Sequence, residues 1–288
     1  MMQRTVFLSP VALFIWIPVF LIGVLSLQSE GVSKHVVLSA APAIPVITTL
    51  PQLTTAVFRV FDVPSGGVIV SSNETKIVSI ASVAKLFTGA AIVMSQPLSS
   101  TTTVTWSDLA AEGEAGKLSY ADTYTYQELL FPLLLESSND AAATLNRSIG
   151  SRLLDIMNTH AKTVGANDTV FTDPSGFRDD TVSTAFDLQL LLTSVYNNQP
   201  HILDISVLPQ YIGTQTGWMN NNPFIHEIGY QGGKHGHTTA AGRTTIAIFD
   251  EEINGRTFTV GYIILGSDNL TEDMTKLRLS VKNSATEN

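Results

Sequence analysis

Residues 80–88 of this chain read IASVAKLFT, and two polar side chains inside this run, Ser82 and Lys85, decide how the rest of the sequence is interpreted. The apolar stretch 83–94 predicts a helix. Side chains three positions apart lie on one helix face, so we expect Ser82 and Lys85 to be neighbours. A lysine whose pKa is lowered by burial can take the serine proton and create a nucleophile. A capping serine followed by a surface lysine has the same spacing, so the pair alone does not establish an active site.

A second polar cluster, Ser137-Ser138-Asn139, follows the apolar run 131–135 and precedes a helical pattern. One interpretation is a loop whose side chains cap the next helix. In the other interpretation, Ser137 passes a proton to a leaving amine and Asn139 holds a substrate amide. Both interpretations stay open at this point.

A third cluster, Lys234-His235-Gly236-His237, follows a glycine pair and precedes a strand pattern. Glycines in a strand let a ligand approach the backbone closely, and Lys234 adds a cation for a substrate carboxylate. The alternatives are a charged loop or a metal site formed by His235 and His237. No third ligand lies nearby in the sequence, so we expect no metal.

The composition predicts one folded domain and excludes several functions. The chain has 288 residues, of which 44% are hydrophobic and 14% charged, enough for one sizeable core. Its net charge of −9, without a Lys/Arg run, argues against nucleic-acid binding. The absence of cysteine excludes disulfides, thiolate metal sites and a cysteine nucleophile. We expect no cofactor.

The N-terminus predicts export. The apolar run 6–27 is uncharged, is about as long as a bilayer span of roughly 20 residues, and follows Arg4. Residues 1–30 are therefore expected to form a single-pass membrane anchor. The alternative is a signal peptide whose cleavage releases a secreted protein, but residues 27–30, LQSE, lack a clear small-residue cleavage site. Residues 31–55 contain irregularly spaced prolines and predict a linker.

The remaining chain predicts a mixed α and β domain over residues 56–282, followed by a tail, 283–288. Strand patterns occur near both ends and helical patterns lie between them. This order favours an antiparallel sheet built from N- and C-terminal strands, with flanking helices and an inserted helical lobe. The predicted hairpins are 56–61 with 68–70 and 244–249 with 257–264; the predicted helices are 83–94, 126–135, 141–149, 151–164, 187–195 and 272–281.

The three clusters together resemble a known signature. S-x-x-K, S-x-N and K-T-G in this order mark serine β-lactamases and penicillin-binding proteins. With the flanks at 133–142, 171–177, 183–188 and 236–242, the chain from about Val57 resembles the D-alanyl-D-alanine carboxypeptidases, the low-molecular-mass penicillin-binding proteins of peptidase family S11. The resemblance implies a β-lactamase/transpeptidase-like fold, bacterial peptidoglycan stem peptides as substrates and β-lactam antibiotics as inhibitors. It also implies a catalytic domain outside the bacterial cell membrane.

The resemblance also implies residue roles. Ser82 would be the acylated nucleophile and Lys85 its base, while Ser137 and Asn139 would relay a proton and position the substrate. Lys234, His235, Gly236 and His237 would bind substrate, and the backbone N–H groups of Ser82 and His237 would form an oxyanion hole. The product would be free D-alanine, and water would then resolve the acyl-enzyme.

Two departures from the family pattern concern one subsite, which binds the terminal carboxylate. The family usually has Thr or Ser where His235 stands, and an arginine where residues 266–273 have none. We hypothesise that a protonated His235 replaces both, so that activity rises as the pH falls. Arg243 is a second source of charge whose side chain the sequence does not place.

Other functions on the same fold are a β-lactamase, a D,D-endopeptidase, or a catalytically impaired protein that binds penicillin or cell wall. A class A β-lactamase is disfavoured because no Glu-x-x-Leu-Asn segment lies between the second and third clusters. The complete set of nucleophile, base and relay residues argues against the impaired protein.

Overall fold

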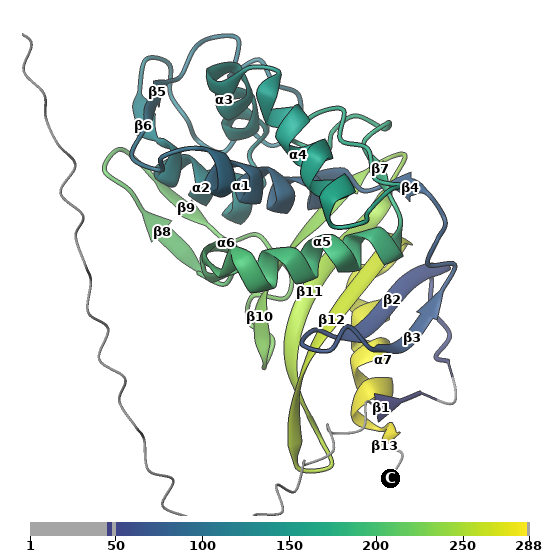
Figure 1. The fold of residues 1–288 in the computed structure, drawn as a ribbon. Helices are drawn as coiled ribbons and strands as arrows, with labels where there is room; N and C mark the ends of the chain where they lie inside the picture. The colour runs from purple at the N-terminus through teal and green to yellow at the C-terminus, as the bar shows by residue number, and fades with distance from the viewer. Residues whose placement is uncertain (1–44, 48–49, 287–288) are drawn as a thin grey trace, which may run out of the picture. The chain divides into compact units, whose positions relative to one another are not determined.

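The structure, a computed structural model, describes residues 45–47 and 50–286. The predicted anchor, 1–30, and most of the predicted linker lie outside the described residues. The main element is a five-stranded antiparallel sheet with the strand order β10-β11-β12-β2-β3 (Figure 1). Its strands are β2 (Val57–Asp62), β3 (Val68–Ser72), β10 (Tyr230–Thr238), β11 (Gly242–Ile253) and β12 (Arg256–Ser267). N- and C-terminal strands therefore share one sheet, as the sequence predicted.

Both faces of this sheet are buried. Successive side chains of a strand point to opposite faces, so neighbouring residues report on the two sides. On β11, Ile246 and Ile248 belong to a core shared with the helical lobe, whereas Ala247 and Phe249 belong to a second core. The second core is closed by α7 (Leu270–Lys282), which packs along β11 and β12. The long apolar runs in the C-terminal strands thus reflect burial on two sides.

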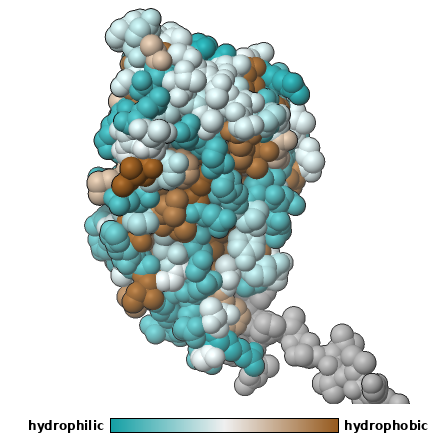
Figure 2. Space-filling model, turned by 90° about the vertical axis from the view of Figure 1, so that its left-hand side faces the viewer, coloured by the Kyte–Doolittle hydropathy of each residue, from teal (hydrophilic) through white to brown (hydrophobic). Residues whose placement is uncertain are grey.

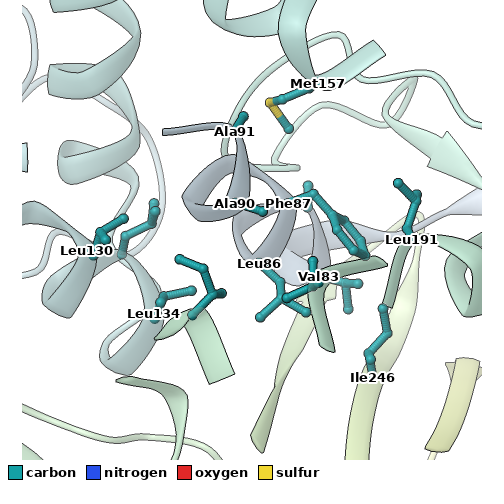
Figure 3. Packing of buried hydrophobic residues seen from close by; sticks show 14 of the residues in the cluster. Val83, Leu86, Phe87, Ala90, Ala91, Leu130, Leu134, Met157, Leu191 and Ile246 are labelled. Atoms are coloured by element: carbon teal, nitrogen blue, oxygen red, sulfur yellow. The ribbon is translucent and has the colours of Figure 1, made fainter. Parts of the chain in front are cut away.

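An inserted helical lobe lies between β3 and β10 and continues the larger core (Figure 1). Its helices are α1 (Ala84–Ser95), α2 (Tyr126–Leu135), α3 (Asn139–Ile149), α4 (Arg152–Thr163), α5 (Ala185–Asn198) and α6 (Pro200–Ser206). Helix α1 is buried along most of its length, and side chains from α2, α4, α5 and β11 surround it (Figure 3). The residues at the start of α1 are therefore fixed by packing from several directions.

Four short antiparallel pairs complete the described fold. They are β4 (Val78–Ser79) with β7 (Val182–Ser183), β5 (Thr101–Thr103) with β6 (Thr123–Thr125), β8 (Gln210–Ile212) with β9 (Gly217–Met219), and β1 (Pro45–Val46) with β13 (Ala285–Thr286). The last pair joins part of the predicted linker to the predicted tail. Thr54 also contacts helix α7, since its backbone N–H donates to the Asp273 carboxylate at 2.8 Å.

The predicted elements agree with the structure except near the clusters and at short elements. Ser82 lies in a 3-10 turn, η1 (Ala81–Val83), before α1 rather than in the α-helix itself. Helix α6 and the β5–β6 and β8–β9 pairs were not predicted, because each is too short to show a period. Pro200, at the first turn of α6, begins a new helix because it lacks the N–H that a helix interior needs.

The surface of the helical lobe mixes polar and apolar side chains. Figure 2 shows separate hydrophobic groups with hydrophilic residues between them on the side that carries β8 and β9. Ile212 and Met219 of this hairpin are exposed. No helix within 45–47 and 50–286 is sufficiently long and apolar to cross a membrane.

Candidate active site

The first cluster forms a close nucleophile–base pair at the start of α1. Lys85 is completely buried, and its Nζ donates hydrogen bonds to Ser82 Oγ at 2.8 Å and to the Ser175 carbonyl at 2.9 Å. Ala81, just before Ser82, has φ of 50°, a left-handed conformation that is strained for alanine. The turn that presents Ser82 is therefore held in place by its surroundings and not by local preference.

Burial and a second lysine lower the pKa of Lys85 well below its ordinary value. Desolvation is the largest cause, and the nearby Lys234 adds to it, while Asp173 and Glu114 oppose it. Burial likewise lowers the pKa of Lys234 to about 7, against an opposing effect of Glu114. The lowered pKa of Lys85 shifts its equilibrium toward the neutral amine, the form that can accept a proton from Ser82.

The second cluster both caps a helix and faces the site. Ser138 caps α3, because its Oγ accepts a hydrogen bond from Ala141 N at 3.0 Å. Ser137 has φ of 61° and lies in the wall of the same cavity as Ser82. Asn139 donates its backbone N–H to Glu114 O at 2.6 Å, whereas its Oδ1 is buried without a hydrogen-bond partner among the described residues. A buried amide oxygen without a partner carries a free-energy cost, which a hydrogen bond from a ligand N–H would remove.

The third cluster lies on β10, an edge strand that passes close to Ser82. A Cβ placed on Gly236 would lie 2.5 Å from Ser82 N, so only glycine permits this approach. Lys234 is buried, and its Nζ donates a hydrogen bond to the His235 carbonyl at 2.6 Å. The structure thus brings Ser82, Lys85, Ser137, Asn139 and residues 234–237 together from three distant parts of the chain.

His235 is neutral in this environment. Burial and the charges of Lys234 and Lys85 lower its pKa to about 2, and its Nδ1 is buried without a partner among the described residues. This low pKa argues against a protonated His235 as the source of charge for a carboxylate, whereas a neutral imidazole can still donate a hydrogen bond. The sequence did not reveal this, because the burial of His235 and its nearness to Lys85 arise only in the fold.

The clusters open into one cavity of about 670 Å³. Its wall contains Ser82, Ser137, His235, His237, Glu114, Arg243, Asp268 and neighbouring residues. Arg243 lies opposite His237 in the β10–β11 pair and is exposed, and its guanidinium makes no hydrogen bond or ion pair with the described residues. Arg243 therefore brings an uncommitted guanidinium to the cavity, which sequence reasoning named but did not place.

Residues 173–177 support the nucleophile from behind. The Ser175 carbonyl accepts from Lys85, and Gly176 has φ of 72° and lies against the Ala81 carbonyl, where a Cβ would collide. Sequence reasoning noted this segment only as a family landmark, because a backbone carbonyl leaves no mark on residue type. Among the described residues, no group of three His, Asp or Glu side chains is arranged to hold a metal ion.

Comparison with known proteins gives consistent matches. The D-alanyl-D-alanine carboxypeptidase model of peptidase family S11 matches residues 45–260. The D-alanyl-D-alanine carboxypeptidase DacB2 of Mycobacterium tuberculosis is 30% identical over 212 residues, covering 68% of this chain and 71% of that protein. A D-alanyl-D-alanine endopeptidase of Pseudomonas aeruginosa is 28% identical over 243 residues, covering 77% of this chain and 78% of that protein.

Solved structures agree with these sequence matches. A D-alanyl-D-alanine carboxypeptidase of Mycobacterium tuberculosis superposes with a TM-score of 0.74 at 25% identity, covering 82% of this chain and 94% of that one. Penicillin-binding protein D2 of Listeria monocytogenes, solved with cefotaxime bound, superposes with a TM-score of 0.71 at 24% identity, covering 81% and 99%. The fold, the arrangement of the three clusters and the extent of the family match lead to one conclusion: the chain belongs to the D-alanyl-D-alanine carboxypeptidases of peptidase family S11.

Proposed function

We propose that this protein is a serine-type D-alanyl-D-alanine carboxypeptidase that removes the terminal D-alanine from peptidoglycan stem peptides through an acyl-enzyme on Ser82. The observation that carries the proposal is the buried Lys85 Nζ, 2.8 Å from Ser82 Oγ, with its pKa lowered by burial and by Lys234. A neutral amine at hydrogen-bond distance is what a serine nucleophile needs.

Acylation follows from this arrangement. Lys85 takes the Ser82 proton as Oγ attacks the carbonyl carbon of the scissile amide. The backbone N–H groups of Ser82 and His237 stabilise the oxyanion. Ser137 passes the proton to the leaving amine, so that D-alanine departs and Lys85 is neutral again. Asn139 accepts a substrate N–H at its unpartnered Oδ1.

Arg243 holds the terminal carboxylate in this mechanism. A planar guanidinium makes paired hydrogen bonds to a carboxylate, and Arg243 has no competing partner among the described residues. His235 is neutral, and Lys234 is buried with its Nζ on a backbone carbonyl. Arg243 thus takes the place of the arginine that residues 266–273 lack.

Mass spectrometry tests the proposal directly. The protein is incubated with a fluorescent penicillin and, separately, with a pentapeptide ending in D-alanyl-D-alanine. We expect a penicilloyl group on Ser82, release of D-alanine, and loss of both in Ser82→Ala. Acylation without D-alanine release would indicate an impaired penicillin-binding protein, and rapid penicillin turnover would indicate a β-lactamase.

A D,D-endopeptidase is the second candidate. Relatives in Pseudomonas aeruginosa and Escherichia coli carry the name D-alanyl-D-alanine endopeptidase, at 28% and 26% identity. A cross-linked peptide dimer separates the two functions. A carboxypeptidase releases D-alanine faster than it cleaves the dimer, and an endopeptidase shows the opposite preference.

The proposed location is the outer face of a bacterial cell membrane. The apolar run 6–27 after Arg4 supports a single-pass anchor, with secretion after signal cleavage as the alternative. Membrane fractionation and N-terminal sequencing of the mature protein distinguish the two.

A further inference from the structure

The loop between β5 and β6 brings an acidic side chain into the active-site cavity. Its backbone is bound to the second cluster at several points. Glu114 O accepts from Asn139 N at 2.6 Å, Ala115 O accepts from Ser138 Oγ at 2.6 Å, and Glu112 O accepts from Asn139 Nδ2. A loop held at three carbonyls within four residues has a defined backbone position. The side chain of Glu114 is therefore carried to a fixed part of the cavity wall, with Ser82 and Ser137 in the same wall.

The Glu114 carboxylate is uncommitted. It is exposed to the cavity and makes no hydrogen bond or ion pair with the residues that the structure describes. Glu114 also raises the pKa of both buried lysines, an effect not found for Asp268, the other carboxylate in the wall. Glu114 is thus the wall carboxylate that acts on the groups directly behind Ser82.

Hydrolysis of the acyl-enzyme needs a base that a water molecule in the cavity can reach. Lys85 and Lys234 are buried and do not line the cavity. His235 lines it, but a pKa of about 2 makes its imidazole a poor proton acceptor. Glu114 lines the same cavity as Ser82, and its exposed carboxylate is accessible to water in that cavity.

We propose that Glu114 is the general base for deacylation: its carboxylate accepts a proton from the water that hydrolyses the acyl group on Ser82. The inference rests on the proposed function, because it requires an acyl-enzyme. The water oxygen bonds to the acyl carbon while its proton passes to Glu114. The bond between that carbon and Ser82 Oγ then breaks. Glu114 then gives this proton to the departing Oγ through water in the cavity, so that serine and glutamate are both restored.

The test compares the Glu114→Gln variant with the unmodified protein, both at full length. Both are acylated with a fluorescent penicillin, excess reagent is removed, and loss of label from Ser82 is followed with time. General-base catalysis contributes roughly 10²- to 10⁴-fold, so we expect the label on Glu114→Gln to persist about 100-fold longer. The acylation rate is expected to change far less than the deacylation rate, because Glu114 acts on Lys85 only through its charge. The matched control is Glu252→Gln, which removes the same charge from an exposed residue near the end of β11. It is expected to deacylate as fast as the unmodified protein.

A second readout uses the pentapeptide. If Glu114 acts only after acylation, kcat and KM fall together in Glu114→Gln while kcat/KM is unchanged, since kcat/KM reports steps through acylation. Loss of label at the normal rate in Glu114→Gln would overturn the inference and leave the proposed function standing. Equal slowing in Glu252→Gln would also overturn it. Failure of Ser82 to be acylated in the unmodified protein would overturn both proposals together. Acylation in the same sample reports a folded site, so misfolding is not confused with slow deacylation.

Discussion

Replacement of Arg243 by glutamine tests how this protein holds its substrate carboxylate. The change removes the guanidinium charge and its paired donors but keeps a polar side chain of similar reach. Arg243 is exposed on β11 and has no partner among the described residues, so its loss leaves no buried group unpaired. We expect the fold to tolerate the change and substrate recognition to suffer.

The magnitude follows from the type of interaction. A hydrogen bond to a charged group contributes about 1.5–3 kcal/mol, and solvent at the exposed Arg243 favours the lower half of that range. A loss of about 2 kcal/mol corresponds to a fall of roughly 30-fold in kcat/KM. Arg243→Lys keeps the charge without the planar pair of donors. Its kcat/KM is expected to lie between that of the unmodified protein and that of Arg243→Gln.

The assay is D-alanine release from two pentapeptides, one with a free terminal carboxylate and one with a terminal amide. The unmodified protein is expected to prefer the carboxylate, whereas Arg243→Gln is expected to lose most of this preference. The two changes then form a double-mutant cycle whose coupling measures the contact. If Arg243→Gln discriminates between the peptides as strongly as the unmodified protein, Arg243 does not bind the carboxylate and the reasoning is refuted.

Three further predictions concern the clusters and their neighbours. Gly236→Ala places a Cβ 2.5 Å from Ser82 N, so we expect penicillin labelling of Ser82 to be lost, and labelling at the normal rate would show that β10 moves away easily. Between pH 5 and 8, the rate of D-alanine release is expected to depend on pH in the same way in His235→Thr and in the unmodified protein. The pKa of His235 is about 2 in the folded protein and about 6.5 in the unfolded chain. Below pH 6.5 the unfolded chain therefore binds a proton that the folded protein does not bind. This lowers the free energy of unfolding by about 2 kcal/mol at pH 5. Urea unfolding of His235→Thr should lack this loss, and an equal loss in both proteins would contradict it. Burial raises the pKa of Asp140 to about 6, and the charge of Asp108 adds to this effect. Above pH 6 the ionised Asp140 therefore lowers the free energy of unfolding by up to about 3 kcal/mol. Below the unfolded pKa of 3.8 this loss is absent. Asp140→Asn should therefore raise Tm at pH 8 and change it little near pH 4, and the reverse order would show that the carboxylate is stabilised.

Much of the fold was predictable because its signals are local. The strand patterns at both ends and the helical runs at 126–135 and 272–281 each contain their own period, and the structure has elements at these places. Short elements such as β8, β9 and α6 have too few residues for a period, and they form because they pack against α2 and β10. The strained turn at Ala81 is a second example, since its left-handed φ contradicts the preference of alanine.

The sequence by itself determined the chemistry of the first cluster. The three-residue spacing of Ser82 and Lys85 predicted that nucleophile and base are neighbours, and the flanking segments indicated the family. Only the tertiary structure decided the charges and the walls of the site. Burial beside Lys234 lowers the pKa of Lys85 and keeps His235 neutral, and strand register and loop docking bring Arg243 and Glu114 to the cavity. Desolvation and long-range contacts are properties of the folded chain, because they depend on residues that are distant in sequence and adjacent only in space.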